Sequence, residues 1–114
     1  MLDKYIEKKE MNIRDFIGGW FVGDFIPTIH STKDFEIGIK SYKKGDTEPT
    51  HKHNVVTEIS IVINGKVKMK EVMNEGDICV LRQEFCPFEA LEDSVMVVVK
   101  IPSIPDDKEF KDKQ

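Results

Sequence analysis

Hydrophobic and polar residues alternate along much of the chain, which is the pattern of β-strands that bury one face. The clearest alternation lies in residues 35–42, where Phe35, Ile37 and Ile39 are separated by polar residues or glycine. We expect this strand to bury its odd-numbered side chains. Further strands are expected at residues 20–22, 57–63, 66–70, 78–81, 88–91 and 95–100. The pattern therefore predicts an all-β domain.

Two turn signals divide these strands. Asn64-Gly65 favours a two-residue hairpin, because a type I′ turn has positive φ angles at both central positions, which suits asparagine and glycine. We expect it to join residues 57–63 to residues 66–70 as neighbouring strands. The Asn-Glu-Gly-Asp sequence of residues 74–77 predicts a second turn.

Two histidines and a glutamate stand at a spacing that a strand and a turn can bring together. His51 and His53 are two residues apart, so their rings point to the same face of an extended strand. Glu58 lies five residues after His53, so the chain must turn or bulge between them for all three to converge. Two imidazoles and a carboxylate suit Fe, Mn, Ni or Zn. The alternative is that both histidines are solvated residues of a polar loop.

The spacing within residues 45–65 resembles the first motif of the cupin family: glycine, five residues, HxH, four residues, glutamate, six residues, glycine. The fixed positions are occupied by Gly45, His51, His53, Glu58 and Gly65. The resemblance implies a cupin double-stranded β-helix, a jelly-roll barrel whose mouth holds a divalent metal ion. It also implies that His51, His53 and Glu58 are the metal ligands and the catalytic residues.

Residues 76–81 resemble the opening of the second cupin motif, a glycine followed by a short apolar strand. The histidine that the family usually has after this strand is absent, and Pro87 stands in its place. Proline has no side-chain donor or acceptor, so Pro87 cannot bind a metal. Cys86 and Glu89 are candidate substitutes, although a buried thiol and a solvent-facing carboxylate are the ordinary roles of such residues.

Length and charge limit the domain organisation and the partners. The 114 residues fit one domain, with a barrel at residues 20–102, an N-terminal arm at residues 1–19 and a charged, exposed tail at residues 103–114. The net charge of −4 argues against nucleic acid and acidic membranes as partners. Two cysteines are too few for a disulfide framework, and the charged N-terminus lacks the apolar core of a signal peptide, so a cytoplasmic protein is expected.

The strand at residues 57–63 predicts an apolar outer surface. If Glu58 points into the barrel, Ser60 and Val62 point the same way. The outward side chains are then Ile59, Ile61 and Ile63. We expect the N-terminal strands or the second subunit of a homodimer to cover them.

These observations lead to one functional hypothesis and two alternatives. The chain is predicted to bind a divalent metal at the barrel mouth and to bind or transform a small polar molecule, with a preference for a carbohydrate or sugar-nucleotide. One alternative is a metal-free sugar-nucleotide isomerase or epimerase, in which His51 or His53 is the base and Glu58 orients the ring or carries the proton. The other is a non-enzymatic barrel that binds a small molecule. Its polar contacts would come from Lys40, Arg82 and Glu84.

Overall fold

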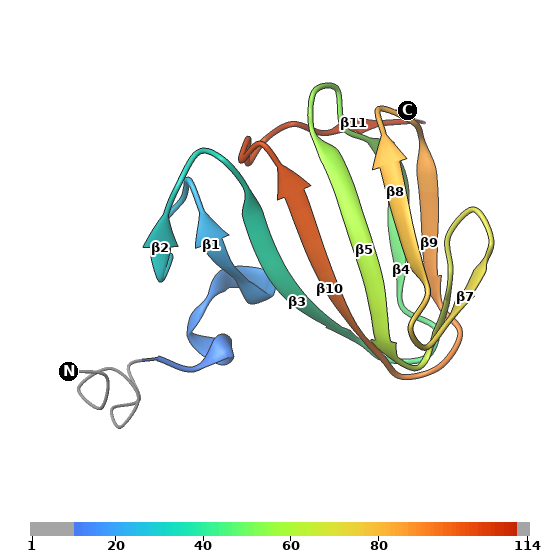
Figure 1. The fold of residues 1–114 in the computed structure, drawn as a ribbon. Helices are drawn as coiled ribbons and strands as arrows, with labels where there is room; N and C mark the ends of the chain where they lie inside the picture. Colours follow the sequence, from blue (N-terminus) through green and yellow to red (C-terminus); the bar gives the residue numbers. More distant parts are fainter. Residues whose placement is uncertain (1–10, 112–114) are drawn as a thin grey trace.

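The chain folds into two β-sheets that face each other around a common core (Figure 1). The computed structural model describes residues 11–111. The larger sheet has six strands in the order β2-β1-β3-β10-β5-β8, and the smaller sheet has five in the order β11-β4-β9-β6-β7. The all-β double-stranded β-helix that the sequence predicts is confirmed.

The elements follow the sequence pattern closely. The six-stranded sheet contains β1 (Trp20–Gly23), β2 (His30–Ser31), β3 (Glu36–Tyr42), β5 (Thr57–Asn64), β8 (Ile78–Arg82) and β10 (Ser94–Ile101). The five-stranded sheet contains β4 (Thr47–Lys52), β6 (Lys66–Lys68), β7 (Val72–Asn74), β9 (Cys86–Ala90) and β11 (Glu109–Phe110). Two short 3-10 helices, η1 (Ile13–Asp15) and η2 (Ile17–Gly19), precede β1. None of the described helices is long and apolar enough to cross a membrane.

The apolar core lies between the sheets and includes side chains from β5, β6, β7, β9 and β10. Its most deeply buried side chains are Val62, Val67, Ala90 and Met96, each 2% exposed or less. The even-numbered residues of β10 point inward, and its odd-numbered residues lie on the partly exposed outer face. This alternation fixes the register of the sheet, because a slip of one residue would turn the core side chains to solvent.

The inner face of the six-stranded sheet carries charged side chains beside this core. Glu36 of β3, Lys100 of β10 and Glu58 of β5 lie opposite one another in one row. Glu36 and Lys100 are buried, at 3% and 7% exposure. The prediction that β3 buries its odd-numbered residues is therefore wrong. The pairing with β10 turns the even-numbered residues inward and leaves Ile37 and Ile39 on the outer face.

The outer face of the same sheet is apolar, as the isoleucine pattern of residues 57–63 predicts. One row across β3, β10, β5 and β8 consists of Ile37, Val99, Ile59 and Val80. The next row consists of Ile39, Val97, Ile61 and Ile78. We call these eight side chains the outer apolar face. Strands β1 and β2 extend the sheet at its β3 edge, so they do not lie over this face (Figure 1).

The predicted hairpin at Asn64-Gly65 is wrong. Strand β5 pairs with β8 and β10, whereas β6 pairs with β7 and β9, so this turn carries the chain from one sheet to the other. Gly65 has a φ of 94° and lies against Asp93 and Ser94 with no room for a side chain. The predicted turn at residues 74–77 is present, where the Asp77 amide donates to the Asn74 carbonyl at 2.9 Å.

The C-terminal segment folds back onto the barrel. The sequence predicts an exposed tail that leaves the sheet. Residues 104–106 and 108–111 are exposed, but β11 pairs with β4 (Figure 1). In this pairing Phe110 lies opposite His51. The pairing is possible because β4 is otherwise an edge strand whose backbone groups on that side have no partner. The predicted arm and tail also include residues 1–10 and 112–114, which lie outside the described residues.

Candidate functional site

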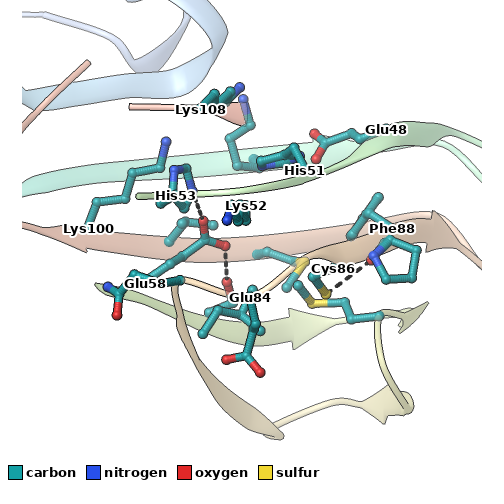
Figure 2. A pocket seen from close by; sticks show the side chains of 18 of the residues that line it. Glu48, His51, Lys52, His53, Glu58, Glu84, Cys86, Phe88, Lys100 and Lys108 are labelled. Carbon is teal, nitrogen blue, oxygen red and sulfur yellow. Dashed lines mark hydrogen bonds and ion pairs between the residues drawn. The ribbon is translucent and has the colours of Figure 1, made fainter. Parts of the chain in front are cut away.

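A pocket of about 80 Å³ lies between the two sheets and contains the three residues that the sequence singles out. His51 and His53 reach it from β4 and the loop that follows, and Glu58 reaches it from β5 (Figure 2). The predicted turn between His53 and Glu58 is formed by residues 54–56. The structure therefore brings all three side chains to one site.

His53 and Glu58 form a buried pair. Nε2 of His53 lies 2.9 Å from Oε1 of Glu58, and the side chains are 6% and 12% exposed. The Ser60 hydroxyl donates to Oε2 of Glu58 at 3.0 Å. Burial raises the pKa of the Glu58 carboxyl, but the hydrogen bond and charge of His53, with the charge of Lys100, outweigh it and hold that pKa below its ordinary value. Glu58 is therefore a carboxylate at neutral pH.

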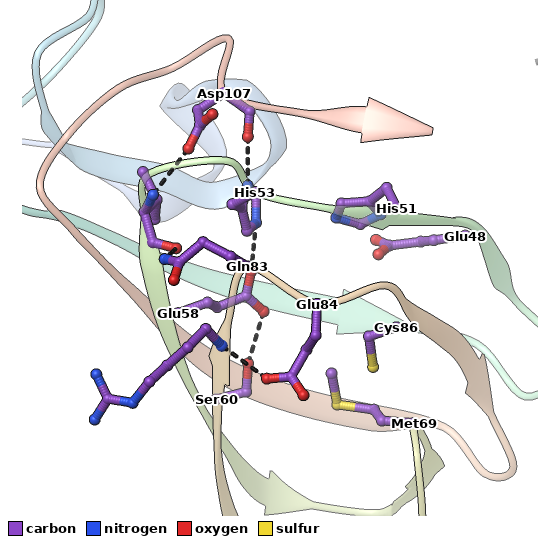
Figure 3. Close-up of polar contacts among 12 residues, drawn as sticks. Glu48, His51, His53, Glu58, Ser60, Met69, Gln83, Glu84, Cys86 and Asp107 are labelled. Carbon is purple, nitrogen blue, oxygen red and sulfur yellow. Dashed lines mark hydrogen bonds and ion pairs between the residues drawn. The ribbon is translucent and has the colours of Figure 1, made fainter. Parts of the chain in front are cut away.

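The contacts of His53 show where its hydrogens lie. Nδ1 is 2.6 Å from the carbonyl oxygen of Asp107, and a carbonyl oxygen can only accept (Figure 3). Nε2 faces the Glu58 carboxylate, which also only accepts. Both ring nitrogens must therefore donate, so the His53–Glu58 pair holds one proton more than a neutral imidazole beside a carboxylate.

His51 is held differently. Its Nδ1 lies 3.0 Å from the carbonyl oxygen of Pro49, which can only accept, so Nδ1 carries a hydrogen. The ring lies edge-on to that of His53, with centroids 5.4 Å apart. Figure 3 shows Glu48 beside His51, and the Tyr42 hydroxyl donates to Glu48 at 3.0 Å. The two histidine rings are thus held next to each other by different backbone carbonyls.

Two residues that the sequence analysis did not identify hold the loop of residues 54–56. The carboxylate of Asp107 accepts the backbone N–H groups of all three loop residues, at 2.9–3.0 Å. From the other side, the Gln83 amide donates to the carbonyls of Val55 and Val56 at 3.0 and 3.2 Å. Asp107 is 51 or more positions away from the loop, so no local sequence signal indicates this contact.

The two candidate substitute ligands, Cys86 and Glu89, lie on opposite sides of β9. Cys86 lines the pocket, and burial raises the pKa of its thiol to about 11, so the sulfur is protonated at neutral pH. Glu89 is exposed on the opposite side of β9 from Cys86 and does not line the pocket. Among residues 11–111, no three His, Cys, Asp or Glu side chains are grouped in the way that a metal ion requires. Nε2 of His53, which a metal would need, is engaged with Glu58.

Solved structures of other proteins share this fold at low sequence identity. A Klebsiella pneumoniae protein with a double-stranded beta-helix domain has a TM-score of 0.67 at 15% identity, over 96% of each chain. A sugar phosphate isomerase from a cupin superfamily of Silicibacter pomeroyi has a TM-score of 0.62 at 18% identity, over 69% of this chain and 57% of that one. The bacterial pirin YhhW of Escherichia coli, in complex with nickel(II), has a TM-score of 0.63 at 12% identity, over 75% of this chain and 39% of that one.

The sequence itself matches no protein-family model and no curated protein. The structural matches are nevertheless made to proteins described as cupins or double-stranded β-helices, as the spacing of residues 45–65 implies. At these identities the likeness establishes the fold alone.

Proposed function

We propose that this small cupin barrel binds a small polar molecule in its pocket and exchanges a proton with it through His51, His53 and Glu58. The observation that carries the proposal is the buried His53–Glu58 pair, in which both ring nitrogens of His53 face acceptors and Nε2 lies 2.9 Å from Oε1 of Glu58. Buried pairs of this kind are typical of general acid–base sites. The sugar phosphate isomerase among the structural neighbours supports a carbohydrate-type molecule as the first class to test.

The two histidines suit opposite roles in such a reaction. His51 is anchored through Nδ1, which leaves Nε2 as the candidate base that would remove a proton from the carbon beside a carbonyl. The His53–Glu58 pair is the candidate acid. Because both N–H groups of His53 are engaged, its proton would pass to the molecule through the Glu58 carboxyl group, and solvent would restore it after the transfer. The carbonyl of Asp107 fixes the orientation of the His53 ring. An isomerisation needs one proton removed and one supplied. His51 would remove the first, and the His53–Glu58 pair would supply the second.

Deuterium exchange tests this proposal. The protein would be incubated in D₂O with sugars, sugar phosphates and sugar-nucleotides in the presence of a chelator, and exchange would be followed by NMR. We expect exchange into one class of substrate and a loss of about 10²- to 10⁴-fold in His53→Gln. The matched control is His30→Gln, because His30 is exposed on β2 and lies outside the pocket. An equal rate in wild type and His53→Gln would contradict the role of the pair.

A metal-dependent activity is the second candidate, and the anchoring of both histidines favours it. Each donates Nδ1–H to a backbone carbonyl, which is the usual second contact of a metal-binding histidine. His51, His53 and Glu58 would hold the ion, and His53 would have to release its Nε2 hydrogen. A bound Fe, Mn, Ni or Zn ion would polarise a substrate oxygen.

Elemental analysis tests the metal. Protein purified without an affinity tag would be analysed for metals, and its melting temperature measured with each added ion. Binding to the folded state raises the melting temperature. An absence of bound metal, together with an unchanged melting temperature, would contradict this candidate.

We also propose that the outer apolar face is the interface of a homodimer. Ile78 and Val80 are 61% and 44% exposed in the single chain, and exposed apolar rows of this kind mark an interaction surface. The same face on two copies is self-complementary in a two-fold dimer.

Analytical ultracentrifugation should show a dimer that Ile61→Lys converts to a monomer. A wild-type monomer at all concentrations would contradict the proposal.

A further inference from the structure

Two lysine ammonium groups lie over the single tryptophan of the chain. Nζ of Lys100 is 4.6 Å from the centre of the Trp20 ring, and Nζ of Lys40 is 5.4 Å from it. The ring lies directly against Gly38, where even a Cβ atom would clash with it. Lys40 also donates to the carbonyl of Gly18 at 2.9 Å. Trp20 is thus a fixed platform with two cations at its surface, and all three side chains line the pocket.

Lys100 is the unusual member of this group. It is 7% exposed, and in the part of the chain that the structure describes its ammonium makes no hydrogen bond or ion pair. Its two cross-strand neighbours are engaged elsewhere, because Glu36 accepts from Ser103 at 3.0 Å and Glu58 accepts from His53 and Ser60. A buried ammonium without a partner is destabilising. Figure 2 shows the Lys100 side chain extending beside His53 on the pocket side.

The remaining charges of the pocket leave it positive. Lys52 and Lys108 also line it, whereas the Glu58 carboxylate is matched by protonated His53. Glu84 is paired with Lys70, which does not line the pocket, and Glu48 accepts from Tyr42. Burial lowers the pKa of Lys100, and the charges of Lys108 and Lys40 act in the same direction against those of Glu58 and Glu36. A nearby anion would therefore stabilise the charged form of Lys100.

We propose that Lys100, Lys40 and Trp20 form a subsite for the carboxylate or phosphate group of a small organic anion. The inference rests on the proposed function, since it names the class of molecule that His53 and Glu58 would act upon. The pocket of about 80 Å³ has room for such a group, since one water molecule needs only about 10–15 Å³ by the same measure. The molecule would place its charged end on the lysines and its reacting end beside the histidines.

Trp20 fluorescence provides a direct test, because it is the only tryptophan. The full-length protein would be titrated with sodium acetate, inorganic phosphate and acetamide at constant ionic strength. Acetamide has the shape of acetate without its charge. We expect a saturable change with at least one anion and none with acetamide. Saturation by acetate alone would assign a carboxylate, and saturation by phosphate alone would assign a phosphate.

Matched variants locate the site. Lys100→Met keeps the apolar stem of the side chain and should weaken anion binding at least about tenfold. Lys40→Met is the second variant, in case the first does not fold. Lys68→Met makes the same change of net charge at an exposed position outside the pocket and should leave binding unchanged. An equal loss in Lys68→Met, an equal response to acetamide, or no saturable response to either anion would overturn the proposal.

The same titration separates this inference from the proposed function. An anion that binds wild type and His53→Gln equally well supports the subsite, whether or not deuterium exchange is observed. Exchange into a neutral sugar by a protein that binds neither anion would sustain the acid–base role of His53 and overturn the subsite.

Discussion

The two faces of the six-stranded sheet differ from those of a simple barrel, because the inner face carries a charged row beside the apolar core and the outer face is apolar. The inner face carries Glu36, Lys100 and Glu58 in one row, while the outer face carries only isoleucine and valine in the parallel row. Polar groups in an interior are stable only when they are hydrogen-bonded or paired. Here Glu36 and Glu58 have such partners, and Lys100 has none among residues 11–111.

This contrast divides the sheet between apolar burial and charge. The apolar core and the outer apolar face supply burial, whereas the charged row places the Glu58 carboxylate and the Lys100 ammonium at the pocket. Four substitutions test that division, in order of decreasing effect.

The largest effect is expected at Met96, which lies at the centre of the inner face at 2% exposure. Met96→Ala should lower the free energy of unfolding by about 2–5 kcal/mol, because it leaves a cavity in a packed core. Its neighbour Val97 lies on the outer face, so Val97→Ala should cost less. Denaturant titration of both variants checks this. An equal cost would mean that the outer face is as deeply buried in the assembly as the core.

Glu58→Gln should lower the free energy of unfolding by about 1–3 kcal/mol at neutral pH, because it removes the buried partner of protonated His53. The pKa of Glu58 is lowered in the folded protein, so its contribution is present above the ordinary value of 4.5. It is lost as the pH falls through the lowered value. The gap between wild type and variant in chemical denaturation should therefore close in acid. The control is Glu75→Gln, at an exposed turn position, for which we expect no gap.

Asp107→Ala should lower the free energy of unfolding by about 1 kcal/mol, because three backbone N–H groups lose their acceptor. We expect local opening of the loop at residues 54–56 to become more frequent, while the apolar core stays folded. Amide hydrogen exchange should therefore quicken at residues 54–56 and remain slow in β10. The matched control is Asp106→Ala, an exposed neighbour. Uniform acceleration across the barrel would show that Asp107 stabilises the whole fold and has no particular effect on the site.

Lys100→Met should produce the smallest change, a gain in stability at neutral pH. The pKa of Lys100 is lowered chiefly by burial, so the folded state disfavours its charge until the pH passes that lowered value. The advantage of the variant should then shrink as the pH rises toward 10.5, the ordinary value for lysine. The free energy of unfolding of wild type and variant would be measured by denaturant titration across this pH range. Lys40, Glu36, Glu58 and Lys108 face position 100 in both proteins, so the difference between the two reports the titration of Lys100. A gap that is independent of pH would contradict the explanation.

The sequence predicted the strands and the meeting of His51, His53 and Glu58 because both depend on local spacing, whereas the barrel was implied by the resemblance to the cupin motif. His51, His53 and Glu58 fall at the fixed positions of one motif, and the turn before Glu58 follows from an odd residue step. The outward direction of Ile59 and Ile61 follows from strand periodicity once Glu58 points inward.

Long-range contacts explain what the sequence did not predict. The alternation in β3 shows two unlike faces, but only its pairing with β10 determines which face is inside. In the sequence, Lys100 is the polar residue at the end of a valine-rich strand, and only the tertiary structure shows that it is buried beside Trp20. In the sequence, Asp107 belongs to a charged tail, and only the structure shows that its carbonyl contacts His53.

The crossing at Asn64-Gly65 has a consequence for how the chain assembles. Strand β5 lies between β10 and β8 in the large sheet, yet both of these neighbours are synthesised later, and it has no local hairpin partner. Loop closure must therefore precede the pairing that satisfies its backbone. This isoleucine-rich strand has two open edges until β8 is made and one until β10 is made, and this interval is when the nascent protein is most exposed to aggregation.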